Sequence, residues 1–297
     1  MKTILITGST QGLGLQIVKK LISKKNVSII MAVRDVDKGK KIALSLSKNI
    51  SVVKLDLSSL KNVKEFINNW NTKIDGLINN AGVQFNSKNS FTSDGFEETI
   101  AVNHIAAFLL TIGLEKYLKN GRILFIGSGT HNPNHPHAKI FGFRGAQYSS
   151  IKQLADGFGN TSDINQLNRD RYSTSKLLNM ITAIELSRRN KNIATYVLDP
   201  GLMPGTGLAR DQNRVMQFLW NFVMPLIGLL LPDTSSPNRS GKAASWIMTT
   251  DYLPYKSGTI FSYNKKPNKY VWKELFLNEK IGKEVYEDTL SIVRPYL

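Results

Sequence analysis

The chain has 297 residues, of which 41% are apolar and 21% charged, a composition that supports a large folded core and excludes a disordered chain. It contains no cysteine, which excludes disulfide bonds and thiol chemistry. Lysine and arginine outnumber aspartate and glutamate by 39 to 22, and the resulting charge of +17 favours anionic ligands or surfaces but says nothing about the fold.

Short β-branched runs alternate with longer segments of helical periodicity along the chain. Strands are predicted at 4–7, 27–33, 51–55, 74–79, 121–127, 193–198 and 259–262, and helices at 13–23, 36–46, 60–70, 96–118, 172–189 and 239–249. Continuous apolar strands separated by helices predict a parallel sheet covered on both faces. We therefore expect one domain over 1–297 with a doubly wound α/β fold, in which helices flank a parallel seven-stranded sheet.

Two local features of these helices can also be predicted. Ser58 or Ser59 is expected to cap the helix over 60–70, because a serine oxygen accepts a bond from an unpaired N–H at a helix start. Gly113 is expected to interrupt the helix over 96–118, because glycine has a low helix propensity.

Two segments do not fit the alternation of strands and helices. Residues 131–170 are polar and long for a connection, so we interpret them as an active-site insert. Residues 203–240 contain the uncharged run 218–231, which is shorter than the roughly 20 residues of a membrane-spanning helix. We interpret 203–240 as a substrate lid, and 218–231 either as part of it, as a peripheral membrane contact or as a buried helix.

The first strand leads directly into a glycine-rich turn. Residues 7–14 have the sequence Thr-Gly-Ser-Thr-Gln-Gly-Leu-Gly between this strand and the first helix. Glycines let a pyrophosphate approach the backbone, and the helix N-terminus offers unpaired N–H groups. The turn therefore predicts a dinucleotide site with the contacts Gly8, Ser9, Gln11, Gly12, Leu13 and Gly14, although an ordinary tight turn has the same pattern.

The turn also leaves no room for a signal peptide, which predicts a cytoplasmic protein, with peripheral membrane attachment as the alternative.

Arg34 and Asp35 follow the second strand and bear on the choice of cofactor. In dinucleotide folds an arginine at this point accommodates a 2′-phosphate, whereas an acidic residue binds the ribose hydroxyl. Arg34 therefore predicts NADP(H). Asp35 would favour NAD(H), the less favoured alternative, unless it simply caps the helix that begins at Val36.

Tyr172 and Lys176 are the residues best suited to acid–base chemistry. They lie four residues apart, so a helix places them on one face. A nearby ammonium favours the phenolate and is expected to lower the pKa of Tyr172. Taken alone, such a pair is more often a solvated surface pair.

Together with other motifs, this pair gives a specific likeness. The chain resembles the short-chain dehydrogenase/reductase family over nearly its whole length. The matching positions, in the order of the family, are the Thr-Gly-x-x-x-Gly-x-Gly stretch at 7–14, Asp56-Leu57, Asn-Asn-Ala-Gly at 79–82, Asn103, Ser128, Tyr172 with Lys176, and Pro200-Gly201 with Thr206. The resemblance implies a Rossmann fold and an oxidoreductase activity.

The resemblance also implies a role for each matching residue. Tyr172 would act as general acid/base, Ser128 would bond the substrate oxygen, Lys176 would tune Tyr172 and hold the nicotinamide ribose, and Asn103 would support a proton relay through water. The implied cofactor contacts, besides the glycine turn and Arg34, are Asp56, Leu57, Asn80, Ala81, Gly82, Tyr172, Lys176, Pro200, Gly201 and Thr206.

Two branches of the family share further stretches with the chain. Residues 32–39 are similar to the NADP-type signature of the retinol dehydrogenase branch, whereas 127–133 and 172–179 resemble light-dependent protochlorophyllide reductase. Relatives of the latter usually carry a cysteine shortly after the lysine, but Leu177 and Leu178 stand there, so the photochemical reaction is not expected. Gln11 replaces a basic residue of many NADP-using members, which leaves the 2′-phosphate mainly to Arg34.

Two other readings are not favoured. His131, His135 and His137 lie in an irregular loop without a nearby cysteine or acidic residue to complete a ligand set, so no metal is predicted. The lysines are scattered and form no basic helix with interleaved aromatic residues, so no nucleic-acid partner is predicted.

The sequence thus predicts an NADP(H)-dependent enzyme that interconverts a lipophilic ketone or aldehyde and its alcohol. The alternatives are NADPH-dependent reduction of a conjugated C=C bond and a non-catalytic regulator that senses NADP(H). The oligomeric state is left open.

Overall fold

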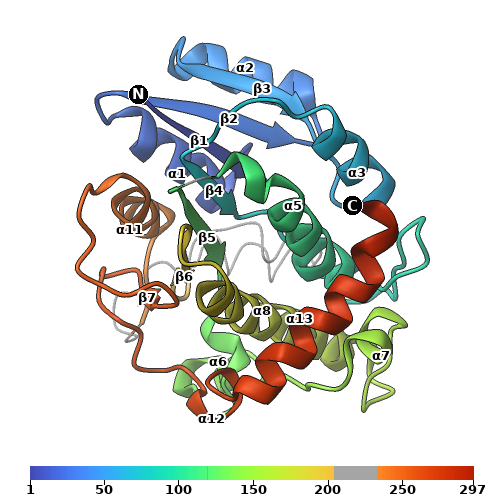
Figure 1. Cartoon of the computed structure of the whole chain (residues 1–297). Coiled ribbons are helices and arrows are strands. Elements are labelled where there is room, and N and C mark those ends of the chain that lie inside the picture. Colours follow the sequence, from blue (N-terminus) through green and yellow to red (C-terminus); the bar gives the residue numbers. More distant parts are fainter. Residues whose placement is uncertain (119, 204–232) are drawn as a thin grey trace.

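The computed structural model describes residues 1–118, 120–203 and 233–297, within which seven parallel strands form one sheet (Figure 1). The sheet order is β3-β2-β1-β4-β5-β6-β7. In chain order the strands are β1 (Lys2–Thr7), β2 (Val27–Val33), β3 (Ile50–Lys54), β4 (Gly76–Asn79), β5 (Arg122–Ile126), β6 (Ala194–Asp199) and β7 (Ile260–Ser262). Because the order reverses between β1 and β4, a crevice opens at the carboxyl ends of these two strands. The predicted doubly wound, seven-stranded fold is confirmed.

Two apolar cores lie on the two faces of this sheet. Ile4 and Ile6 of β1 join one core, and Leu5 between them joins the other, because successive side chains of a strand point to opposite faces. The first core is completed by α1 (Gly12–Ile22), α2 (Val36–Leu46) and α11 (Pro237–Thr249). The second is completed by α3 (Leu60–Asn68), α5 (Ala106–Leu114), α8 (Ile164–Arg189) and α13 (Glu279–Val293), which packs outside α8.

The predicted helix over 96–118 is irregular, but not at Gly113. It comprises α4 (Glu98–Ile100), a π-helical turn at Ala101–Ile105, α5 and a 3₁₀ turn at Glu115–Tyr117. The predicted interruption at Gly113 is wrong, because this glycine lies inside α5 against the side chain of Ile67. The helical span Glu98–Tyr117 is long and apolar enough to cross a membrane, but 78% of its most apolar window is buried, as in a core helix.

The helix that carries Tyr172 begins earlier than predicted. α8 starts at Ile164, where the Asp163 side chain accepts a bond from Asn165 N at 2.9 Å. The predicted insert 131–170 therefore includes the first turns of α8, together with α6 (Pro136–Ile140) and α7 (Ile151–Ala155). The first turns of α8 are mostly polar and contact other polar groups, so they show no apolar period that would have predicted a helix.

The last part of the chain contains helices that the sequence analysis did not predict. These are α12 (Lys273–Phe276), α13 and a 3₁₀ turn at Arg294–Tyr296. The buried face of α13 includes Val285, Thr289 and Val293, whose helical spacing could have indicated it.

The predicted lid falls largely outside the described residues, as do Thr206 and the run 218–231. Its predicted end at 240 is too late, because α11 already begins at Pro237 behind the N-cap Ser236.

Of the two candidate caps for α3, Ser59 is the one that accepts a bond from the helix, from Asn62 N at 3.2 Å.

Candidate active site

Two cavities lie beside each other at the carboxyl ends of the strands. The larger cavity has a volume of about 570 Å³ and extends from the glycine turn to Lys176. The second has a volume of about 480 Å³, and we call it the aromatic cavity because five aromatic side chains line it, from Phe141, Phe143, Tyr172, Tyr263 and Tyr270. Tyr172 lines both cavities, so its hydroxyl-bearing ring stands where they meet.

Most of the predicted cofactor contacts line the larger cavity. They are Gly8, Gln11, Gly12, Leu13, Gly14, Arg34, Asp56, Leu57, Asn80, Ala81, Gly82, Tyr172, Lys176 and Pro200. Gly201 and Ser128 line the aromatic cavity instead. Ser9 is fully buried and lines neither cavity.

The glycine turn has the shape that a phosphate requires. Gly8 and Gly12 have φ angles of +65° and +55°, which favour glycine, and a Cβ on Gly12 would meet nothing within 4 Å. A Cβ on Gly14 would collide with the Gly8 carbonyl oxygen. The side chain of Gln11, at the N-cap of α1, forms no capping bond, so it leaves the first N–H groups of α1 for an anion.

Two cations stand at the end of the larger cavity next to β2. Arg34 is exposed, and among the described residues no carboxylate pairs with it. Asp35 caps α2, because its Oδ1 accepts a bond from Lys38 N at 2.9 Å. Lys38 also lines this cavity and was missed by the sequence analysis, although its position four residues after Arg34 could have indicated it.

Asn80 connects β4 to the glycine turn. Its amide nitrogen donates to the carbonyl oxygens of Thr7 and Gly8, each at 2.9 Å. In return, Thr7 Oγ1 accepts bonds from Asn80 N at 3.1 Å and Ala81 N at 3.0 Å. The side chain of Asn80 therefore holds the turn in place at the wall of the larger cavity.

The structure brings Ser128, Tyr172 and Lys176 together. The side chains of Ser128 and Tyr172 both line the aromatic cavity, Ser128 acts to lower the pKa of Tyr172, and Ser128 Oγ accepts from Thr130 Oγ1 at 3.1 Å. Lys176 Nζ lies 5.5 Å from the centre of the Tyr172 ring and donates to the carbonyl oxygen of Ile126 at 3.3 Å. A phenol, a hydroxyl and an amine thus share one end of the sheet.

Burial has the largest effect on the pKa values of both Tyr172 and Lys176. It raises the pKa of Tyr172 to about 12, and the hydrogen bond from Ser128 offsets only part of that rise. Burial also lowers the pKa of Lys176 to about 8. The expected lowering of the Tyr172 pKa by Lys176 is therefore not found, because removal of the phenolate from water raises the pKa and the Asp199 carboxylate raises it further.

Asn103 lies in the π-helical turn and lines neither cavity. Its side chain accepts from Val83 N at 2.7 Å and donates to Val83 O at 2.9 Å and to Ser175 Oγ at 3.0 Å. It therefore joins the loop after β4 to α8. Gly82 stands between Asn103 and Lys176, since a Cβ there would lie 3.2 Å from Asn103 Oδ1 and 3.4 Å from Lys176 Nζ.

Both ring nitrogens of His131 are bonded to the protein backbone. Nδ1 donates to Ser128 O at 2.6 Å, and Nε2 accepts from Trp272 N at 3.3 Å. Burial lowers the pKa of His131, in keeping with a neutral ring. His135 packs against Tyr270 with ring centres 5.1 Å apart. These contacts give His131 and His135 structural roles in the insert.

Asp199, at the end of β6, is a polar residue of the aromatic cavity that the sequence analysis missed. Its carboxylate accepts from Gly201 N at 3.0 Å and from Asn268 Nδ2 at 2.8 Å. Apart from Tyr172, the aromatic side chains of this cavity were also missed, because they come from the insert and from the segment after β7. Only the fold brings these segments together.

Comparisons with known proteins agree with this geometry. The family model for short chain dehydrogenase matches residues 2–162. The chloroplastic protochlorophyllide reductase of Pisum sativum is 31% identical over 283 residues, covering 88% of this chain and 69% of that protein. An uncharacterised protein of Mycobacterium paratuberculosis has a TM-score of 0.67 at 22% identity. The match covers 99% of this chain and 94% of the mycobacterial protein. The 3-ketoacyl-(acyl-carrier-protein) reductase of Brucella melitensis, complexed with NADH, has a TM-score of 0.63 at 17% identity. The match covers 89% of this chain and 98% of the reductase.

Proposed function

This chain belongs to the short-chain dehydrogenase/reductase family of oxidoreductases, and on that premise we propose that it interconverts a lipophilic ketone or aldehyde and its alcohol with NADP(H). The observation that carries the proposal is the position of Tyr172. Its ring lines both cavities, Ser128 lines the aromatic cavity with it, and the Lys176 amine lies beside its ring.

The residues of the larger cavity fit an NADP(H) molecule. The open glycine turn and the start of α1 suit its pyrophosphate, and Arg34 and Lys38 suit a 2′-phosphate. Lys176 stands at the other end of the cavity, where it would hold the nicotinamide ribose. When bound, the cofactor supplies or accepts the hydride.

The chain itself supplies a proton donor, a hydrogen bond to the substrate oxygen and an apolar surface for the substrate. With its pKa at about 12, Tyr172 keeps its proton at neutral pH and can donate it to the substrate oxygen during reduction. Ser128 orients that oxygen, and a protonated Lys176 stabilises the phenolate that remains. The rings around the aromatic cavity favour a lipophilic substrate and exclude water.

A second candidate reaction is the NADPH-dependent reduction of a conjugated C=C bond. It is favoured by the relative named protochlorophyllide reductase. The photochemical version of this reaction is not proposed, because Leu177 and Leu178 are fully buried core residues where such relatives usually carry a cysteine. The similarity of 32–39 to the retinol dehydrogenase branch favours carbonyl chemistry, which we place first.

A panel of lipophilic aldehydes, ketones and enones tests the proposal. We expect NADPH oxidation, followed by absorbance, with ketones and aldehydes, and NMR spectra of the enone products should show an allylic alcohol. A saturated ketone as product would instead establish C=C reduction. Binding of NADPH without turnover of any member would favour a regulator that senses NADP(H). Equal affinity for NADPH and NADH would remove the role proposed for Arg34.

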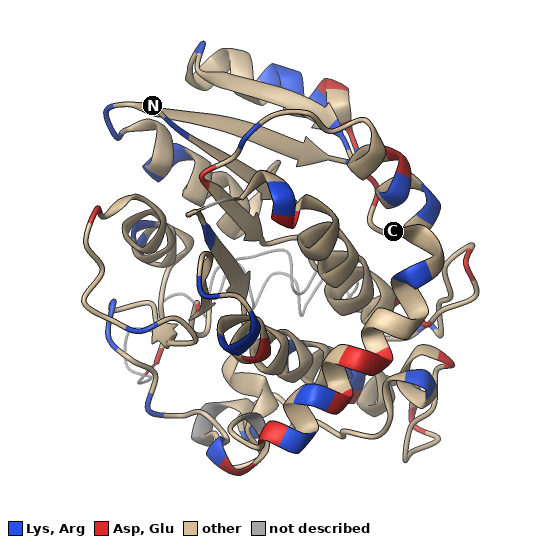
Figure 2. Ribbon diagram, viewed as in Figure 1, with Lys and Arg blue, Asp and Glu red and all other residues tan. Residues whose placement is uncertain are grey.

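The partners and the compartment are part of the same proposal. We propose a small lipophilic substrate, no nucleic-acid partner and a cytoplasmic location, with membrane contact through 218–231 as the alternative. Lysines and arginines lie on many helices around the sheet, including α2, α3 and α13, rather than along one of them (Figure 2). Cell fractionation and sedimentation with anionic vesicles separate a free protein from one bound to membranes.

A further inference from the structure

Arg169 stands in the wall of the aromatic cavity close to the reacting group. It precedes Tyr172 by three residues on α8, so the two side chains share one face of the helix. Both residues line the aromatic cavity, and among its described lining residues Arg169 is the one lysine or arginine. A cation is therefore built into a wall that is otherwise rich in aromatic and aliphatic side chains.

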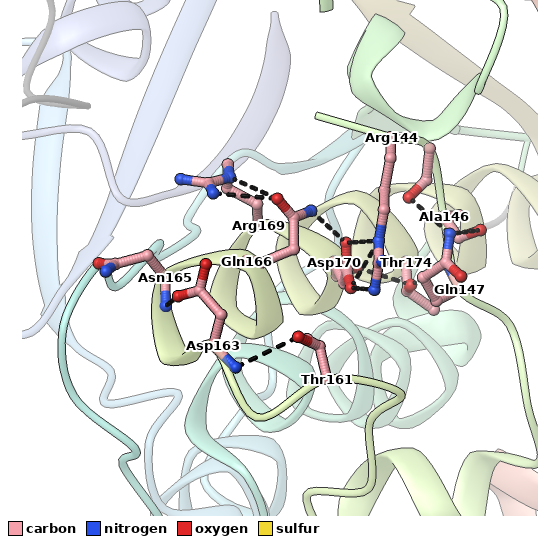
Figure 3. Close-up of polar contacts among 11 residues, drawn as sticks. Arg144, Ala146, Gln147, Thr161, Asp163, Asn165, Gln166, Arg169, Asp170 and Thr174 are labelled. Atoms are coloured by element: carbon pink, nitrogen blue, oxygen red, sulfur yellow. Dashed lines mark hydrogen bonds and ion pairs between the residues drawn. The ribbon is translucent and has the colours of Figure 1, made fainter. Parts of the chain in front are cut away.

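A neutral amide holds the guanidinium of Arg169 in place. Gln166 Oε1 accepts from its Nε at 3.2 Å and from its Nη2 at 2.9 Å (Figure 3). The amide nitrogen of Gln166 donates to Asp170 Oδ1 at 2.8 Å. Because a carboxylate can only accept a hydrogen bond here, Gln166 must turn its nitrogen to Asp170 and its oxygen to Arg169. The orientation of Arg169 is thus determined by an acidic residue that it does not contact itself.

The nearby carboxylate is already neutralised by another arginine. Arg144 Nη2 lies 2.6 Å from Asp170 Oδ2, and Arg144 Nε donates to Asp170 Oδ1 at 3.1 Å (Figure 3). The Asp170 side chain is 5% exposed, whereas that of Arg144 is 45% exposed. Within the described part of the chain, no ion pair includes Arg169. Its positive charge therefore has a fixed position, and no carboxylate of the described residues lies within ion-pair distance of it, although Asp199 and Asp233 line the same cavity.

We propose that Arg169 binds a carboxylate of the substrate, so that the natural substrate is a lipophilic carbonyl compound with an acidic group. This inference rests on the proposed function. The planar guanidinium matches a carboxylate through two parallel hydrogen bonds, and Nη1 and the remaining N–H of Nη2 are not used by Gln166. Tyr172 would act on the carbonyl oxygen while Arg169 holds the acid one helical turn away.

Matched acids and esters provide the test. The probes are aryl ketones with two to six methylene groups between the ketone and a carboxylate, each paired with its methyl ester. We expect the protein to prefer at least one acid over its ester. Arg169→Gln should raise the KM for that acid about 10- to 100-fold, the value of a charge-assisted pair, with kcat and the ester kinetics nearly unchanged.

Three further variants separate a specific contact from a general effect. Arg169→Lys keeps the charge but loses the planar fork, so it should restore part of the acid preference. Gln166→Ala should weaken the same preference to a smaller extent, because Gln166 positions Arg169. Lys139→Gln is the matched charge control, since Lys139 is an exposed residue of the insert that lines neither cavity, and it should leave the acid-to-ester ratio unchanged.

Direct binding distinguishes failure of this inference from failure of the proposed function. Calorimetry with 5-phenylpentanoate and its primary amide needs no turnover. If no ketone reacts but the protein prefers the acid and Arg169→Gln abolishes that preference, the function is wrong and the anion site stands. If acids and esters react equally well, or if Arg169→Gln impairs both equally, the inference about Arg169 is overturned and the function stands.

Discussion

Burial shifts the pKa values of Tyr172 and Lys176 in opposite directions, yet both groups stay protonated at neutral pH. A proton donor for reduction must keep its proton at neutral pH, and burial ensures this by raising the pKa of Tyr172 to about 12. The amine must be charged to stabilise the phenolate, yet burial lowers its pKa to about 8. At neutral pH both groups are protonated, which is the state that reduction requires.

Removing the phenol tests its role most directly. Tyr172→Phe should lower kcat for ketone reduction about 100- to 10,000-fold, because the substrate oxygen loses its proton donor. The dissociation constant for NADPH, measured by fluorescence titration, should change little. Tyr148→Phe is a matched control, since Tyr148 is a half-buried tyrosine of the insert that lines neither cavity. A Tyr172→Phe enzyme with near-normal turnover would contradict the mechanism.

The pH dependence of reduction should follow Lys176 rather than Tyr172. As pH rises through about 8, Lys176 loses its proton and can no longer stabilise the phenolate, so kcat/KM for reduction should fall. Tyr172 stays protonated until about pH 12 and contributes no fall in this range. Initial rates from pH 6 to 10 at saturating NADPH measure the profile. A rate that stays constant to pH 9.5 would rule out this assignment.

At the scale of elements, α8 unites the parts of the site. Its first turns carry Gln166, Arg169 and Asp170, and its later turns carry Tyr172 and Lys176. Gln147 N donates to Thr174 Oγ1 at 2.8 Å, so the insert is bonded to the same helix (Figure 3). The helix therefore aligns the wall of the aromatic cavity with the reacting phenol.

The packing of α5 on α3 gives a prediction at this scale. A Cβ on Gly113 would lie within 2.9 Å of Ile67 Cγ1, so Gly113→Ala should destabilise the protein by about 1–3 kcal/mol despite the better helix propensity of alanine. Urea denaturation measures the free energy of unfolding. Adding Ile67→Ala removes the obstructing atoms, and the second change should cost less in the Gly113→Ala protein than in the native one. Additive effects would show that the two residues do not interfere.

At the scale of the whole molecule, His104 joins three segments that lie far apart in the chain. It is 1% exposed, and its Nε2 lies 3.0 Å from Thr289 Oγ1 of α13 while its Nδ1 lies 3.3 Å from Asn179 Oδ1 of α8. His104 itself lies in the π-helical turn. Burial lowers its pKa to about 4, so the folded protein keeps this ring neutral.

This buried ring makes the fold sensitive to acid. Between pH 6.5 and about 4 the unfolded chain binds a proton at His104 that the folded protein does not, so stability falls as pH falls through this window. The loss should reach about 3 kcal/mol, since each tenfold change in proton affinity is worth about 1.4 kcal/mol. Urea denaturation from pH 4 to 7 should show a shallower slope for His104→Gln than for the native protein. Equal slopes would exclude His104 as the source.

The sequence by itself determined the alternation of strands and helices, the glycine turn, the pairing of Tyr172 with Lys176 and the capping position of Asp35. These features depend on residues close together in the chain, so their spacing is sufficient to predict them. Local sequence patterns did not predict the structure where a residue contacts residues that are distant in the chain. The polar start of α8 depends on contacts such as that of Arg144 with Asp170, and Gly113 is tolerated because Ile67 packs against it.

Only the tertiary structure decided the aromatic cavity, the position of Arg169 outside every ion pair of the described residues, and the pKa values of Tyr172 and Lys176. The cavity joins the insert to residues after β7, as the bond from Trp272 N to His131 Nε2 shows. A pKa or an unpaired charge depends on how much water and which groups surround a side chain. Folding alone sets these surroundings, because it brings together segments that the sequence keeps apart.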